Sequence, residues 1–249
     1  MAHRFELPQE GVVNASPERV WGAIATGPGW DSWFLGRSQI EPREGGKVSM
    51  SIGDWTETST IETWDPPRRF VSESAPGSDG SFHRFDYALE PRESGRTAIR
   101  YVHSGMLGDD WEAEYEGMSE GDPMYFRSLL EYVEHFPGRF GVPINATGPN
   151  MGDDREGVMR TFSRALGIGD DLSVGQRVSL TPEGFDRIEG VVDELSPSFL
   201  GVRTDDATYR FIYGYDGTTF IGHHVFDQGV DREREESAWR GWLERVFPR

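Results

Sequence analysis

The sequence predicts an α+β fold in which a long helix covers one curved antiparallel sheet, followed in the chain by a shorter unit of the same kind. Three observations support this prediction. A capped helix begins at Ser16, alternating strands extend from about residue 48 to residue 103, and an amphipathic helix opens at Asp122. A sheet with one apolar face must bury that face, and the helix after Asp122 is the only element of the first half long enough to cover it.

The composition disfavours several classes of protein. The 249 residues include 43 acidic and 25 basic side chains, which gives a formal net charge of −18. This charge disfavours binding to nucleic-acid phosphates and to anionic membranes. The absence of cysteine rules out disulfides and thiolate metal sites. The chain start lacks the apolar stretch of a signal peptide, and no segment reaches membrane-spanning length, so we expect a cytoplasmic protein.

Two short helices are predicted near the start of the chain. Ser16 suits the N-cap of the first helix, and Pro17 suits its first position, where the missing N–H of proline costs nothing. The apolar residues of this helix then fall on one face. Asp31-Ser32 is expected to cap the second helix, which carries Trp33 and Phe34.

Strands are expected on both sides of these helices. Residues 5–13 form an expected edge strand, and alternation of apolar and polar residues predicts a half-buried strand at 48–52. Two more strands, at 56–64 and 70–74, are joined through Pro66-Pro67, because proline cannot donate to a strand ladder. The next two strands each place one set of side chains on one face: His83, Phe85, Tyr87 and Leu89, and then Ile99, Tyr101 and His103.

The helix that closes the first half is expected to begin at Asp122-Pro123. Its apolar residues follow helical spacing: Phe126, Leu129, Leu130 and Val133. The acidic stretch at 108–116 is predicted to be a solvated lid, in which Trp111 and Tyr115 close over the mouth of a cavity. That cavity would form if the sheet and the helix are splayed.

A set of short motifs at positions 10–137 matches one known family in order. The matching residues are Pro17, Val20-Trp21, Trp33-Phe34, Gly45-Gly46, Pro66-Pro67-Arg68-Arg69, Leu89-Glu90-Pro91 and His103-Ser104-Gly105. This segment resembles the activator-of-heat-shock-protein-ATPase-like branch of the START/polyketide-cyclase (SRPBCC) superfamily. The resemblance implies the helix-grip fold, in which the sheet wraps around a long C-terminal helix and leaves room for a ligand.

The second half looks like a degenerate copy of the first. We expect a helix-grip domain at 1–138, a Gly/Pro-rich linker at 139–153 and a shorter helix-grip-like domain at 154–249. The segment Gly175–Leu180 repeats the pattern of Gly45–Met50. Two later segments of the second half also repeat the patterns of segments in the first half, at a similar offset of about 130 residues. No first strand and no Trp-Phe helix are evident in this copy.

The leading functional hypothesis is a module that binds a hydrophobic or amphipathic small molecule between the first sheet and its long helix. The residues expected to contact the ligand are Trp21, Trp33, Phe34, Phe85, Tyr101, His103, Tyr125 and Phe126. The alternative hypothesis is an enzyme of the cyclase, aromatase or hydrolase type. Its candidate catalytic residues are His83, Tyr101 and His103.

Two further interpretations concern partners and metals. The family resemblance implies a co-chaperone that contacts a heat-shock ATPase, and a homo-oligomer is a further alternative. Two adjacent histidines, His223 and His224, resemble a metal-binding pair. Adjacent residues of a strand point to opposite faces of the sheet, however, so the two side chains cannot bind one ion without help. We therefore expect neither a metal nor a cofactor.

Overall fold

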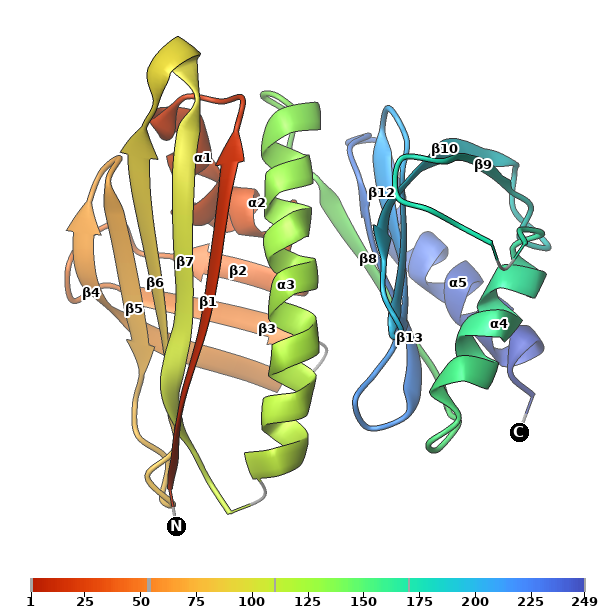
Figure 1. Ribbon diagram of the computed structural model, residues 1–249, viewed down its shortest axis with the longest axis horizontal. Coiled ribbons are helices and arrows are strands. Elements are labelled where there is room, and N and C mark those ends of the chain that lie inside the picture. Colours follow the sequence, from red (N-terminus) through yellow and green to blue (C-terminus); the bar gives the residue numbers. More distant parts are fainter. Residues whose placement is uncertain (1, 53–54, 110, 170, 249) are drawn as a thin grey trace. The chain divides into compact units, whose positions relative to one another are not determined.

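The structure is a computed structural model that describes residues 2–52, 55–109, 111–169 and 171–248. The chain divides into two compact units between Phe140 and Gly141 (Figure 1). Each unit contains one antiparallel sheet and its own helices, which confirms the predicted α+β class and the presence of two sheet-and-helix units. No helix of the described residues is long and apolar enough to cross a membrane.

The N-terminal unit contains a seven-stranded sheet, with strand order β1-β7-β6-β5-β4-β3-β2. Its elements, in chain order, are β1 (His3–Val13), α1 (Pro17–Ile24), α2 (Gly27–Trp30), β2 (Arg37–Ile40), β3 (Lys47–Ile52), β4 (Trp55–Asp65), β5 (Arg69–Ser74), β6 (Phe82–Pro91), a 3-10 turn (Glu93–Gly95), β7 (Thr97–Leu107) and α3 (Trp111–His135). The first strand pairs with the last, and the strands between them form a meander.

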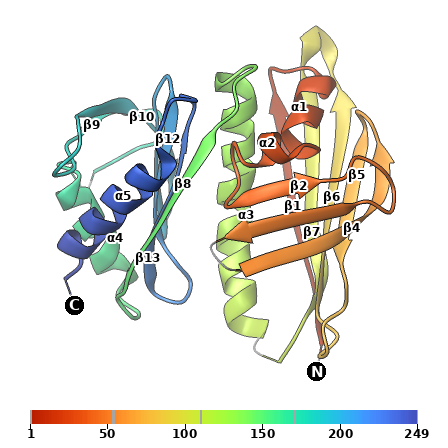
Figure 2. The ribbon, with the colours of Figure 1, turned by 180° about the vertical axis from the view of Figure 1, so that it is seen from behind.

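Local chemistry accounts for the first helix and for the turn between β4 and β5. The Ser16 side chain accepts a hydrogen bond from the backbone N–H of Arg19, and Pro17 occupies the first helical position, as predicted. Pro66 and Pro67 lie in the predicted turn. Helix α3 lies alongside β1 and β7 (Figures 1 and 2), where it covers the apolar face of the sheet.

Two helix predictions for the N-terminal unit were wrong. The second helix is capped by Thr26, whose side chain accepts from the N–H of Gly29, and it ends before Trp33 and Phe34. Helix α3 begins at Trp111 instead of Asp122. Pro123 lies inside it, where proline removes one helical hydrogen bond without ending the helix. Of the stretch predicted to be a lid, residues 111–116 form the first turns of α3, and residue 110 lies outside the described residues.

The C-terminal unit contains a six-stranded sheet with strand order β8-β13-β12-β11-β10-β9. Its elements are β8 (Val142–Asn150), α4 (Arg155–Ala165), β9 (Arg177–Leu180), β10 (Ile188–Leu195), β11 (Phe199–Arg203), β12 (Ala207–Tyr213), β13 (Thr218–Val225) and α5 (Arg232–Val246). As in the first unit, the first strand pairs with the last, and a helix ends the unit. Its described residues form no counterpart of β2 or α2, so the strand order is the same with fewer elements.

The linker predicted at 139–153 is instead mostly strand β8. This segment alternates: Ile144 and Ala146 are buried, whereas Thr147 is exposed. Its two prolines, Pro143 and Pro149, masked the pattern in the sequence. Prolines are tolerated here because β8 lies at the edge of the sheet and pairs only with β13. The second unit therefore has the first strand that the sequence did not reveal, and its first residue is Gly141 rather than Asp154.

Aromatic side chains of α4, α5 and β12 form the core of the C-terminal unit. Phe162 contacts the rings of Phe211 and Trp242, at centroid distances of 5.7 and 6.1 Å. Asp154 and Asp231 cap the two helices, as their sequences indicate. These contacts place both helices on one face of the sheet.

Replacing Ile144 tests whether β8 is a structural strand. We expect Ile144→Ala to lower the free energy of unfolding by about 2–5 kcal/mol, because it leaves a cavity in the core. Thr147→Ala on the same strand should change it by less than about 0.5 kcal/mol. Urea unfolding followed by circular dichroism measures both. A neutral Ile144→Ala variant would support the linker interpretation.

Candidate functional site

The candidate site of the N-terminal unit is a small pocket between the sheet and the segment that follows α1. Strands β6 and β7 contribute Phe85, Tyr87 and Tyr101, and the α2 region contributes Trp30 and Phe34. The other lining residues come from β3 and β4: Val48, Met50, Glu57 and Ser59. Aromatic rings thus form most of the wall.

The pocket is small. Its volume is about 50 Å³, whereas pockets for drug-sized molecules typically measure about 300–1,000 Å³. Stacked rings lie beside it: the ring centroids of Tyr87 and Tyr101 are 4.7 Å apart, and those of Tyr101 and Phe126 on α3 are 6.1 Å apart. The lining of this pocket includes no residue of α3, so the cavity expected between the sheet and the long helix stays a prediction.

A hydrogen-bonded chain of ionisable side chains connects β6, β7 and α3 beside this pocket. Nδ1 of His83 lies 3.0 Å from Nε2 of His103, and Nδ1 of His103 lies 2.9 Å from Oδ2 of Asp122. At the outer end, Nε2 of His83 lies 3.3 Å from Oε1 of Glu114. His103 and Asp122 are buried, whereas Glu114 is exposed, so the chain leads from solvent into the interior. We call these four residues the relay.

The hydrogen-bond partners fix the number of protons that the relay needs. Both carboxylates accept, so a bond at each of the three contacts requires three protons on the two imidazole rings. Two neutral rings carry only two protons. Burial lowers the pKa of His83, and the neighbouring charge of His103 lowers it further. With both rings neutral, bonds at the two inner contacts require that His103 donates from Nδ1 to Asp122 and that His83 donates from Nδ1 to Nε2 of His103, which leaves no proton for the contact with Glu114.

The tyrosines of the pocket wall are coupled to the inner end of the relay. Burial raises the pKa of Tyr101 well above its usual range, and Tyr87 and Asp122 raise it further through charge and hydrogen bonding. Burial and the charge of Asp122 also raise the pKa of Tyr125 on α3. These hydroxyls therefore stay protonated and serve as hydrogen-bond donors rather than as bases.

The structure brings only some of the predicted site residues together. Phe34, Phe85 and Tyr101 line the pocket. His103 lies behind Phe85, at a ring distance of 4.4 Å, and Tyr125 packs on Phe34 at 4.6 Å. His83 and Phe126 contact this group from the sides, through His103 and Tyr101.

Two predicted ligand contacts are not part of the pocket lining, although Trp33 packs against the wall residues Trp30 and Phe34 at ring distances of 5.9 and 5.4 Å. Trp33 is buried and donates from its indole nitrogen to the carbonyl of Ala23, at 3.0 Å, so it anchors the chain to α1. Trp21 packs against Trp64 and Phe70 at 5.0 and 6.4 Å. Neither lines the pocket.

The sequence analysis missed Asp122 and Glu114 as site residues. Asp122 was interpreted as the start of a helix, although it lies inside one and faces the sheet. Glu114 was interpreted as part of a lid. Periodicity gave no signal for either, because a carboxylate that faces inward from a helix looks like any polar residue in a helical pattern.

Comparisons with known proteins identify the N-terminal unit only. Residues 14–134 match the profile of the family described as "Activator of Hsp90 ATPase homolog 1-like protein". No curated protein matches the chain.

Three solved structures of similar fold each cover about half of this chain. Protein MLL2253 from Mesorhizobium loti is 19% identical, covers 51% of this chain and 95% of its own, and has a TM-score of 0.45. The Aha1 dimer from Colwellia psychrerythraea is 19% identical to this chain and has a TM-score of 0.43. The match covers 52% of this chain and 96% of the Colwellia chain. Protein SA2116 from Staphylococcus aureus is 16% identical to this chain and has a TM-score of 0.47. The match covers 53% of this chain and 94% of SA2116.

Removing the inner carboxylate of the relay tests its contribution to stability. Asp122→Ala leaves the Nδ1–H of His103 without its acceptor in a buried setting, and we expect the free energy of unfolding to fall by about 1–3 kcal/mol. Asp122→Asn keeps an oxygen acceptor and should cost less. Chemical denaturation of both variants measures the difference; equal stabilities of the two variants would contradict the assignment.

The lowered pKa of His83 predicts a pH dependence of stability. Below about pH 6.5 the unfolded chain takes up a proton that the folded chain resists. The free energy of unfolding should therefore fall from pH 7 to pH 5.5, and it should fall less in His83→Gln. Urea unfolding at the two pH values tests this. The same fall in both proteins would show that other groups cause it.

Proposed function

Residues 14–134 belong to the Activator of Hsp90 ATPase homolog 1-like family, and from this premise we propose that the N-terminal unit binds a slender amphipathic small molecule in the pocket beside Tyr101. The apolar part of the ligand would lie against Phe34 and Phe85. Its polar end would bond to a tyrosine hydroxyl at the wall.

The observation that carries this proposal is the position of the relay. Placing His103 and Asp122 beside stacked aromatic rings costs more free energy than an apolar core of the same volume. If this interior served packing alone, the buried His103 and Asp122 would add no stability over apolar side chains. Beside a ligand, the hydrogen bond to Asp122 orients Tyr101, and the raised pKa keeps its hydroxyl protonated.

The pocket volume restricts the class of ligand. About 50 Å³ accommodates part of a narrow chain but no ring system unless side chains move. Phe34 and Met50 are half-buried, so they are the wall residues best able to shift and admit a longer alkyl group. A straight-chain alcohol therefore represents the proposed class better than a polycyclic compound.

Filling the pocket tests the proposal. We expect 1-hexanol to bind the full chain in a calorimetric titration, and we expect Ser59→Leu to weaken binding at least about tenfold because leucine occupies the pocket. Ser49→Leu is the matched control, because position 49 alternates with the lining residues Val48 and Met50 and so faces the other side of the sheet. Equal binding by both variants, or no binding by the native chain, would refute the proposal.

A second candidate function is an enzyme that moves a proton during its reaction. The specific observation in its favour is that the relay connects exposed Glu114 to the buried end at Asp122. His83, His103 and Tyr101 would be its catalytic residues. If turnover of a small carbonyl compound is found, His83→Ala and His103→Ala should abolish it, whereas a pure binding module should lose affinity only.

Contact with a chaperone ATPase, self-association and a cytoplasmic location remain predictions. The family description supports the first, and a pull-down with the ATPase tests it. Sedimentation of the purified chain tests the second, and fluorescence microscopy of a tagged chain tests the third.

A further inference from the structure

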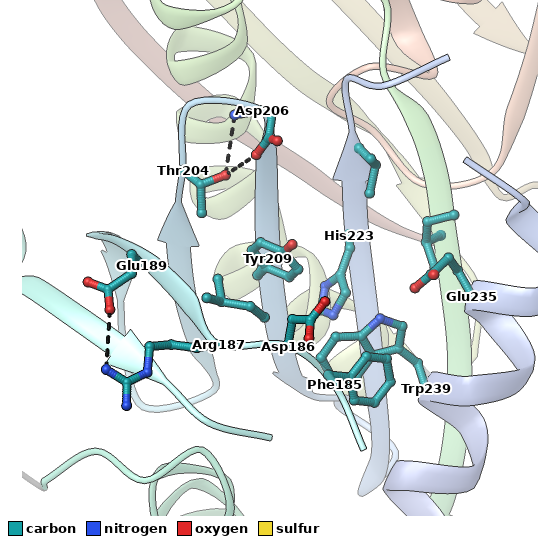
Figure 3. Close-up of a pocket in the computed structure, with 13 residues that line it drawn as sticks. Phe185, Asp186, Arg187, Glu189, Thr204, Asp206, Tyr209, His223, Glu235 and Trp239 are labelled. Carbon is teal, nitrogen blue, oxygen red and sulfur yellow. Dashed lines mark hydrogen bonds and ion pairs between the residues drawn. The ribbon is translucent and has the colours of Figure 1, made fainter. Parts of the chain in front are cut away.

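The C-terminal unit contains a larger pocket that the sequence analysis did not predict. It lies between β10, β12, β13 and α5 and has a volume of about 360 Å³ (Figure 3). Three aromatic side chains form its wall. Phe185 and Trp239 stack at 4.0 Å, and Tyr209 lies 6.4 Å from Trp239. The volume falls within the range of about 300–1,000 Å³ found for small-molecule sites.

His223 presents an unused hydrogen-bond donor at the inner wall of this pocket. Its Nδ1 accepts from the backbone N–H of Arg210 at 3.0 Å, so its proton is on Nε2. Nε2 has no partner among the described residues, although the side chain is only 1% exposed. Burial lowers the pKa of His223 well below its usual range, and the charges of His224 and Arg210 lower it further, so the ring stays neutral.

An unpaired buried N–H costs about 1–3 kcal/mol. Native proteins pair such groups with protein, water or ligand. In Figure 3 the His223 ring lies between Tyr209 and Trp239 and points into the pocket that these residues line. The ring is 4.6 Å from Trp239 and edge-on to it, so the face of the indole is the alternative partner for the N–H.

Carboxylates surround the pocket. Four line it, at Asp186, Glu189, Asp206 and Glu235, against one guanidinium, at Arg187. Arg187 pairs with Glu189 at 3.7 Å, and Asp206 accepts from the Thr204 hydroxyl at 2.8 Å. The site is therefore electronegative, and it attracts cations and repels anions.

We propose that this pocket binds a small aromatic amine, whose ring lies among Phe185, Tyr209 and Trp239. An oxygen or ring nitrogen at the inner end of the ligand accepts from Nε2 of His223, and an ammonium group at the outer end faces Asp186 and Glu235. Aromatic faces attract ammonium groups as well, which adds to the selectivity for cations. This inference concerns the C-terminal unit and is independent of the function proposed for the N-terminal unit.

Tyramine is the probe for this proposal, because it joins a phenol oxygen to an ammonium group across one ring. We expect it to bind the full chain, with an affinity about fivefold higher than that of 2-phenylethylamine, which lacks the oxygen. The anion 3-(4-hydroxyphenyl)propionate, of similar shape, should bind at least about tenfold more weakly. Calorimetric titration at two salt concentrations measures each affinity, and tyramine binding should weaken as salt rises.

Three variants assign the binding to this pocket. Glu235→Gln should weaken tyramine binding about three- to tenfold. Glu233→Gln, at an exposed position of the same helix that does not line the pocket, should leave it unchanged. His223→Asn retains an acceptor near Nδ1 and removes Nε2, and it should weaken binding about tenfold.

A spectroscopic measurement on the native chain covers the case in which His223→Asn does not fold. The Nε2–H resonance of His223 should move when tyramine is added. The proposal is wrong if tyramine does not bind, if it binds no better than the anion, or if Glu235→Gln and Glu233→Gln bind it equally. An Nε2–H resonance that does not move would show that Trp239 already uses this donor, and it would also overturn the proposal.

Discussion

The hydrogen bonds that join His83, His103 and Asp122 are the interaction on which the interior of the N-terminal unit depends. They connect the adjacent strands β6 and β7 to α3 through two contacts, of 3.0 and 2.9 Å. Apolar contacts between a sheet and a helix allow sliding, whereas a bonded chain fixes the helix at one position along the strands. The aromatic rings of Phe85 and Tyr101 then pack at fixed positions around it.

The two units share one strand order, but their interiors differ in the size of the pocket. In the N-terminal unit, Trp30 of α2 and Phe34 close over the sheet, and stacked rings leave a pocket of about 50 Å³. No counterpart of α2 occurs in the part of the C-terminal unit that the structure describes, and the pocket beside α5 measures about 360 Å³. The common strand order supports a tandem of two related units, and an origin by duplication remains a prediction.

Signals carried by neighbouring residues were predictable from the sequence. Ser16 and Pro17 marked α1, and alternation placed His83 and His103 on the same face of the sheet. Features that depend on residues far away in the chain could not be predicted from the sequence. Proline suggested a helix start at Pro123 and a linker around Pro143, because only the sheet order shows that β8 is an edge strand. The role of Asp122 required knowing which side of α3 faces His103.

The protonation states of the two histidines test the central claim most directly. Nitrogen chemical shifts of the His83 and His103 rings, measured by NMR near pH 7, report which ring nitrogen carries each proton. A fixed interior chain predicts that both rings are protonated at Nδ1, with Nε2 of His103 accepting from His83. Protons on Nε2 in both rings, in fast exchange with water, would contradict it.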